Sequence, residues 1–120
     1  MLERTPSTLE RIFTASERAY ASTLADPVPT LAARFAAREA VMKALGGGLG
    51  AFDLHDVWID REESGRPHLR IEGKALELSR VANVTSWNVS LTHTATIAVA
   101  YVIATGPTCA TQSALDGNPR

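Results

Sequence analysis

The sequence lacks the features that would place it among secreted or membrane proteins. It has one cysteine in 120 residues, so no disulfide can form within the chain, which suits a reducing compartment. Its longest strongly apolar stretch, residues 97–104, is far shorter than the roughly 20 residues that cross a bilayer. The first residues have no apolar core, which excludes a secretory signal. We therefore expect a soluble cytoplasmic protein that does not associate with a membrane.

An excess of charge of one sign is also absent. Twelve Lys and Arg stand against thirteen Asp and Glu, so the composition favours no nucleic-acid partner. Apolar residues make up 45% of the chain and charged residues 21%, the proportions of a globular domain. We expect residues 1–105 to form one domain. Residues 106–120, which contain much Gly, Pro, Ser, Thr and Asn, are expected to form a flexible tail.

The first half of the chain carries the signals of α-helices. A Thr-x-x-Glu capping box predicts a helix over residues 14–24, which the prolines of residues 25–29 interrupt. Residues 31–45 are dominated by alanine and contain no Gly or Pro, so they predict the best helix of the chain, with Thr30 as its cap. The glycines of residues 46–50 are expected to end it.

The second half changes from helical periodicity to alternation. Four strands are expected, in two hairpins, at residues 57–60, 69–71, 86–92 and 96–103. A short helix is expected between the hairpins, over residues 73–80. Helices and strands that are grouped in this way predict an α+β domain, with an antiparallel sheet packed against the long Ala-rich helix.

The long helix combines an apolar face with charged residues. On a helical wheel the face expected to enter the core contains Leu31, Phe35, Met42 and Leu45. Arg38 falls near the middle of this face, and because an unpaired buried cation is costly, it should meet an anion or a polar partner. Glu39 and Lys43 lie one turn apart on a flanking stripe, and Arg34 lies on the other flank.

The residues alone leave three interpretations of this helix open. It is a surface helix with a weak Glu39–Lys43 pair, or a metal and phosphate site, or a partner interface. In the second case Glu39 supplies an oxygen ligand, and Arg34 and Lys43 meet phosphate oxygens. The glycines at 46–50 lack the spacing of a P-loop, yet beside Lys43 they would let backbone amides approach a phosphate.

His93 is the histidine best placed for chemistry. It lies at the end of a predicted strand between Thr92 and Thr94, where it can bind phosphate or transfer a proton. The alternative is a turn histidine whose hydrogen bonds are satisfied locally. His55 and His68 lack such surroundings, and we interpret both as surface residues.

Four segments follow one another in the order and approximate spacing of the holo-[acyl-carrier-protein] synthase family. Residues 34–46 resemble its signature of a Glu and a Lys four apart in an Ala-rich helix followed by glycines. Residues 56–67, which end in Gly-Arg-Pro, resemble its Asp-Ile/Val strand and Gly-Lys-Pro turn. Residues 89–94 resemble its Ser-Leu-Ser-His-Thr strand end. Residues 13–20 resemble the Phe-Thr-x-x-Glu segment near its start, so the resemblance covers residues 1 to about 105.

The resemblance implies an enzyme that moves 4′-phosphopantetheine from coenzyme A to a serine of apo acyl carrier protein in fatty acid biosynthesis. It implies dependence on Mg²⁺ and a homotrimer with active sites between subunits. Glu39 would be the metal ligand, and Glu39, Lys43 and His93 the catalytic residues. The residues implied to contact coenzyme A are Arg34, Lys43, Gly65, Arg66, Pro67, Thr92, His93 and Thr94. Arg4 would contact the acidic carrier protein.

The sequence departs from the family pattern in two ways. Family members begin with a Gly-x-Gly-x-Asp strand whose Asp is a second metal ligand, and this strand has no counterpart here; without it a sheet edge would be exposed. Arg38 and Arg66 stand where Lys is common, which keeps the charge but changes its geometry. Two further hypotheses therefore stand beside the enzyme. One is a non-catalytic module that binds coenzyme A or a carrier protein. The other is an unrelated α+β trimer with a structural Glu39–Lys43 pair.

Overall fold

Helices and strands alternate in groups along the chain, as the sequence predicts. The computed structural model describes residues 6–47 and 50–107, so Arg4 and nearly all of the predicted tail lie outside the described residues. The elements are α1 (Pro6–Ile12), α2 (Ala15–Ala21), α3 (Val28–Ala44), the 3₁₀ turn η2 (Leu54–Asp56), β1 (Val57–Arg61), β2 (Pro67–Ile71), α4 (Gly73–Val81), β3 (Ser86–His93) and β4 (Ala98–Thr105). None of the described helices is long and apolar enough to cross a membrane.

Helix α2 begins at the predicted capping box. The Thr14 hydroxyl accepts a hydrogen bond from the backbone N–H of Glu17 (3.3 Å), and the Glu17 carboxylate accepts one from the backbone N–H of Thr14 (3.1 Å). These reciprocal bonds satisfy two donors that the first turn of a helix otherwise leaves unpaired. The helix ends at Ala21, three residues earlier than expected.

Helix α3 begins at Val28, so the prediction that Thr30 caps it is wrong. Pro29 lies in its first turn, where a missing amide hydrogen costs nothing and the fixed φ of proline already suits the helix. Because α2 already ends at Ala21, before Pro27 and Pro29, these prolines mark the start of α3 and do not themselves end α2. The predicted C-terminal stop is confirmed, because Gly46 adopts φ +80° directly after the C-cap residue Leu45.

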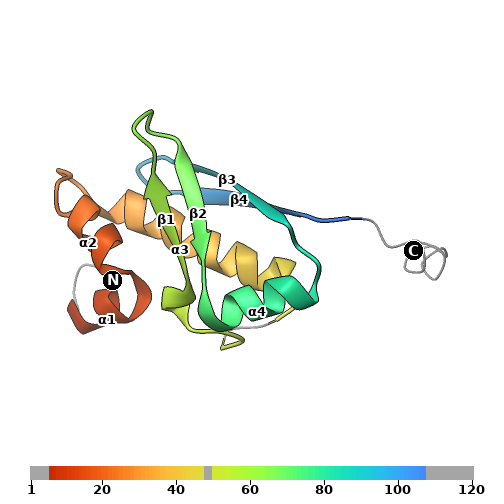
Figure 1. Cartoon of the computed structure of the whole chain (residues 1–120). Helices are drawn as coiled ribbons and strands as arrows, with labels where there is room; N and C mark the ends of the chain where they lie inside the picture. Colours follow the sequence, from red (N-terminus) through yellow and green to blue (C-terminus); the bar gives the residue numbers. More distant parts are fainter. Residues whose placement is uncertain (1–5, 48–49, 108–120) are drawn as a thin grey trace.

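The strands form two antiparallel hairpins, β1–β2 and β3–β4. The β3–β4 ribbon runs along α3, while the β1–β2 hairpin crosses the helix, with β2 close to β3 (Figure 1). The α+β fold and the packing against the Ala-rich helix are confirmed, although the described strands hydrogen-bond as two sheets rather than one. Small side chains on α3, including the buried Ala33 and Ala37, leave room for the strands to approach the helix.

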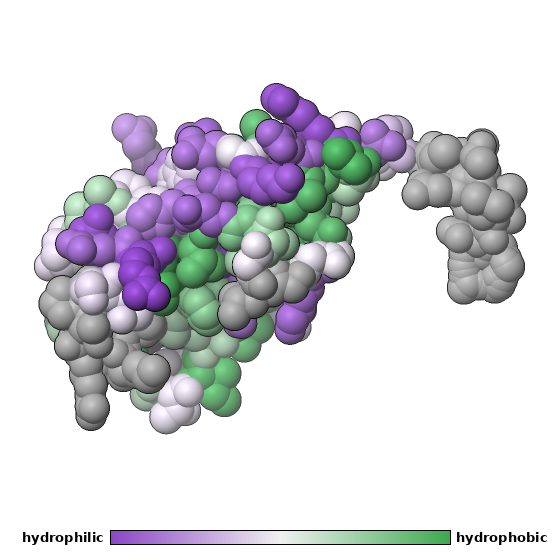
Figure 2. Space-filling view, turned by 90° about the horizontal axis from the view of Figure 1, so that it is seen from below, coloured by the Kyte–Doolittle hydropathy of each residue, from purple (hydrophilic) through white to green (hydrophobic). Residues whose placement is uncertain are grey.

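Two apolar clusters make up the core. The larger surrounds α3 and contains Ala37, Val41, Met42, Phe52, Val57, Ile59, Leu69 and Ala75. The smaller joins Phe13, Ala21 and Leu31 at the N-terminal side. Leu31 and Met42 are buried as predicted, whereas Phe35 and Leu45 are partly buried. At the surface, hydrophobic and hydrophilic residues separate into adjoining bands (Figure 2).

A residue of η2 caps a helix that begins much later in the sequence. The Asp56 carboxylate accepts a hydrogen bond from the backbone N–H of Ala75 in the first turn of α4 (3.2 Å). Gly73 lies against the same carboxylate with φ +62°, and a Cβ at this position would lie 2.6 Å from Asp56 Oδ1. The spatial closeness of η2 and α4 thus depends on an aspartate at 56 and a glycine at 73.

The sequence predicts that Arg38 meets an anion or a polar partner, and in the structure this partner is Glu17. Both side chains are completely buried. Arg38 Nη1 donates to Glu17 Oε2 (3.2 Å), Arg38 Nη2 donates to Glu17 Oε1, and Arg38 Nε donates to the carbonyl of Leu54 (2.9 Å). Glu17 Oε2 also accepts a hydrogen bond from the backbone N–H of Ile59 (3.0 Å). One buried ion pair therefore connects α2, α3, η2 and β1.

Removing one partner of this pair should destabilise the fold strongly. We expect Glu17→Ala to lower the free energy of unfolding by about 3–5 kcal/mol, because the Arg38 cation would remain buried without an anion. Urea denaturation followed by circular dichroism measures the change. The exposed Glu77→Ala serves as the control and should change stability by less than about 0.5 kcal/mol. Equal effects of the two variants would contradict this role.

Candidate active site

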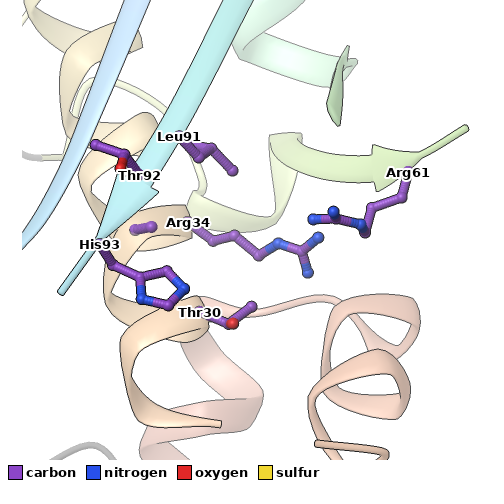
Figure 3. Close-up of a pocket in the computed structure, with 7 residues that line it drawn as sticks. Thr30, Arg34, Arg61, Leu91, Thr92 and His93 are labelled. Carbon is purple, nitrogen blue, oxygen red and sulfur yellow. The ribbon is translucent and has the colours of Figure 1, made fainter. Parts of the chain in front are cut away.

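A cavity of about 290 Å³ opens where the end of β3 meets the first turns of α3. Its lining residues come from α3, from the end of β1 and from the end of β3, and they are Thr30, Ala33, Arg34, Arg61, Leu91, Thr92 and His93. Figure 3 shows the guanidinium groups of Arg34 and Arg61 extending toward one another and the His93 ring directed toward Thr30. The two arginines thus give this cavity a cationic lining, and the His93 ring adds a further hydrogen-bonding group.

Arg34 is the most unusual residue of the cavity. Only 1% of it is exposed, and its Nε and Nη1 atoms have no hydrogen-bond partner among the described residues. Burial lowers the pKa of the Arg34 guanidinium, the charge of Glu17 raises it, and the charge of Arg61 lowers it again. Buried guanidinium donors without partners are costly. An anion in the cavity would accept hydrogen bonds from them and so stabilise Arg34 in this position.

Arg61 and Tyr20 are functional candidates that the sequence analysis missed. The guanidinium carbons of Arg34 and Arg61 lie 4.9 Å and 5.4 Å from the centre of the Tyr20 ring. A signal for Tyr20 was available, because it follows Glu17 by three residues and so lies on the same side of α2 as the buried carboxylate. For Arg61, at the end of a predicted strand beside a turn, no signal in the sequence pointed to the cavity.

Of the three coenzyme A contacts predicted at the end of β3, two line this cavity and one does not. Thr92 and His93 line the cavity, as the phosphate-binding interpretation requires. Thr94 does not. Its hydroxyl accepts hydrogen bonds from the backbone N–H groups of Thr96 (3.2 Å) and Ile97 (3.1 Å), which closes the turn between β3 and β4.

Residues of the Gly-Arg-Pro turn lie at a second cavity, of about 230 Å³, between the β1–β2 hairpin and β3. It is lined by Glu62, Arg66, Pro67, His68, Leu69, Trp87, Asn88 and Val89. Gly65 is not among the lining residues; it supplies the φ of +91° that the turn requires. Within one chain, the residues predicted to contact coenzyme A therefore divide between two cavities.

Glu39 and Lys43 lie apart from both cavities, exposed on α3. Although both residues are described, no ion pair joins them. Over the described ranges no three His, Cys, Asp or Glu side chains gather into a metal-binding group. Mg²⁺, however, commonly takes only one or two protein carboxylates and completes its shell with phosphate oxygens and water. An exposed Glu39 fits a Mg²⁺ that is held mainly by the phosphates of a bound substrate.

Comparison with known proteins connects this chain to one family. The sequence model of the 4′-phosphopantetheinyl transferase superfamily matches residues 1–110. The holo-[acyl-carrier-protein] synthase of Streptomyces griseus is 47% identical over 107 residues, which are 88% of this chain and 85% of the relative. That of Moorella thermoacetica is 47% identical over 92 residues, 77% of this chain and 72% of the relative.

Solved structures agree with the sequence relatives. The holo-[acyl-carrier-protein] synthase of Neisseria meningitidis superimposes with a TM-score of 0.75 at 26% identity, over 86% of this chain and 83% of that one. The enzyme of Helicobacter pylori, solved in complex with coenzyme A, gives a TM-score of 0.68 at 26% identity over 82% of both chains. The chain therefore belongs to the 4′-phosphopantetheinyl transferase superfamily, among the holo-[acyl-carrier-protein] synthases.

Proposed function

We propose that this protein transfers 4′-phosphopantetheine from coenzyme A to a serine of apo acyl carrier protein, in fatty acid biosynthesis. The observation that carries the proposal is the cationic cavity, in which buried Arg34 has unpaired donors beside Arg61 and His93. A ligand rich in phosphate suits such a cavity, since guanidinium groups bind phosphate oxygens with charge-assisted hydrogen bonds. The coenzyme A complexes of relatives support the same ligand class.

In this reaction the serine hydroxyl attacks the phosphorus that carries the pantetheine arm. A new P–O bond forms, the bond to the second phosphate of the pyrophosphate breaks, and adenosine 3′,5′-bisphosphate leaves with the electron pair. Such transfers depend mainly on positioning and charge neutralisation. Arg34, His93 and Thr92 would hold phosphate oxygens in the first cavity. Arg66 and Pro67 would line the nucleotide part of the site.

Glu39 and Lys43 would complete the catalytic set with His93. Glu39 would hold Mg²⁺, which when bound neutralises charge on the pyrophosphate. Lys43, one turn further along α3, would add a second positive charge near the same phosphates. The proton of the serine would leave through a water hydrogen-bonded to Glu39. Gly65 would act only by shaping the turn that presents Arg66 and Pro67.

The division of these residues within one chain favours a site assembled between copies. Side chains on the outward face of β4 are apolar and exposed: 36% for Val99, 70% for Tyr101 and 61% for Ile103. Ile97, in the preceding turn, is 61% exposed. A row of large apolar side chains of this kind is typical of a surface that a partner covers. We propose a homotrimer in which β4 packs against a neighbouring subunit.

Arg34→Met tests the cavity as the phosphate site. We expect the dissociation constant for coenzyme A, measured by calorimetry, to rise about 10- to 100-fold, because charge-assisted hydrogen bonds are lost. The free energy of unfolding should stay constant or increase, since a buried cation without partners is removed. Arg80→Met, on the exposed side of α4, is the matched control and should change neither quantity. Loss of stability with unchanged binding would refute the assignment.

Glu39→Gln tests the transfer step itself. Mass spectrometry of apo acyl carrier protein should detect the added phosphopantetheine with the wild-type protein, coenzyme A and Mg²⁺. We expect the variant, and the wild type with a chelator, to be slower by about 100-fold or more. Glu77→Gln is the matched control. If the wild type binds coenzyme A but forms no product, the protein is a non-catalytic binding module. If Glu39→Gln leaves both binding and transfer unchanged, its assigned role is wrong.

The assembly is tested by light scattering after gel filtration. We expect the wild type to have the mass of three chains and Tyr101→Lys to shift it toward one chain, because a charge would enter an apolar interface. Val81→Lys replaces a more exposed apolar residue, on α4, and should leave the mass unchanged. A wild-type protein that is monomeric at assay concentration and fully active would argue against the trimer.

A further inference from the structure

The ring of Tyr20 contacts both arginines of the cavity without lining the cavity itself. The three residues come from different elements: Tyr20 from α2, Arg34 from α3 and Arg61 from the end of β1. No other aromatic ring among the described residues lies over these two guanidinium groups. Tyr20 is therefore the one described side chain in contact with both cations of the cavity through its π face.

Two cations near one another need something to hold them there. The nearest buried carboxylate, Glu17, is already occupied by Arg38 and by backbone donors. Like charges repel, and an arginine side chain loses considerable rotamer freedom when it is held in one orientation. The electron-rich face of an aromatic ring attracts guanidinium groups and offsets part of this cost.

We propose that Tyr20 is a positioning residue, which holds the guanidinium groups of Arg34 and Arg61 toward one another at the cavity before substrate binds. A phosphate group that carries more than one negative charge then meets two oriented cations. This inference rests on the proposed function, because it takes that phosphate to be part of coenzyme A. Pre-orientation of this kind increases affinity by lowering the entropy lost on binding.

The two arginines should depend on the ring to different degrees. Arg34 is almost fully buried and is confined by its surroundings, whereas Arg61 is exposed and has fewer constraints. No hydrogen bond among the described residues uses the Tyr20 hydroxyl, so the ring face rather than the hydroxyl makes the contact. Phenylalanine at position 20 should therefore keep the two arginines in position, because it retains the ring face. Leucine should not, although it also places an apolar side chain there.

The first experiment needs no ligand. In the wild type and in Tyr20→Phe, NMR should find the Nε–H groups of Arg34 and Arg61 shifted by the aromatic ring, with restricted side-chain motion at Arg61. In Tyr20→Leu both signals should lose the ring shift, and the Arg61 side chain should become mobile. Thermal unfolding of each variant shows whether the fold is retained. A rigid Arg61 in folded Tyr20→Leu would overturn the proposal.

The second experiment measures binding of coenzyme A and of 3′-dephospho-coenzyme A by calorimetry. We expect Tyr20→Leu to weaken coenzyme A binding by about tenfold or more, and Tyr20→Phe by less than about twofold. With Arg61→Gln already present, adding Tyr20→Leu should have a clearly smaller effect, because Tyr20 acts largely through Arg61. If Tyr20→Leu weakens binding of 3′-dephospho-coenzyme A less than binding of coenzyme A, the 3′-phosphate is the group bound here. If it weakens binding of both ligands equally, the pyrophosphate is.

The two experiments separate this proposal from the proposed function. If the wild type binds no coenzyme A while the NMR signals depend on the ring as expected, the ligand assignment fails and the positioning role stands. If the wild type binds coenzyme A and Tyr20→Leu binds it equally well, the positioning role fails and the function stands. If Tyr20→Phe and Tyr20→Leu lost the same affinity for coenzyme A, the ring face would not be the cause of the tighter binding in the wild type.

Discussion

The buried pair of Glu17 and Arg38 is the constraint on which the rest of the structure depends. Neither charge is tolerable alone in the core, so α2, α3, η2 and β1 must come together in the one arrangement that pairs them. Tyr20 lies one turn beyond Glu17, and Arg34 one turn before Arg38. The arrangement that satisfies the pair therefore also brings the Tyr20 ring to the Arg34 guanidinium, and the geometry of the cavity follows from the geometry of the core.

Helix α3 serves as the shared support of two different chemical surfaces. Arg34 and Arg38 point into the protein, whereas Glu39 and Lys43 lie on the solvent side. A rigid helix fixes the distance between these groups even though neither of the two cavities described above contains them all. In the proposed function, phosphate binding and metal binding would thereby be separated on one chain. A neighbouring subunit in the proposed trimer would bring them to the same substrate.

Local signals predicted most of the fold, and long-range contacts account for what was missed. The Thr14 capping box, the glycine at 46 and the two alternating segments are each readable within a few residues. That Arg38 needs an anion followed from its place on the helix, but Glu17, 21 residues earlier, already had a local role in the capping box. The cavity gathers Tyr20, Arg34 and Arg61 from three segments, and no periodicity in the sequence relates them.

The contact of Asp56 with the start of α4 has a consequence for how the protein opens. A helix of nine residues is too short to be stable by itself in water. Its cap comes from a residue that precedes the whole β1–β2 hairpin, so the cap exists only while that hairpin is closed. The hairpin and α4 should thus open together, as a single cooperative unit. A substrate that tightens the Arg66 turn would therefore also slow hydrogen exchange in α4, although it does not contact that helix.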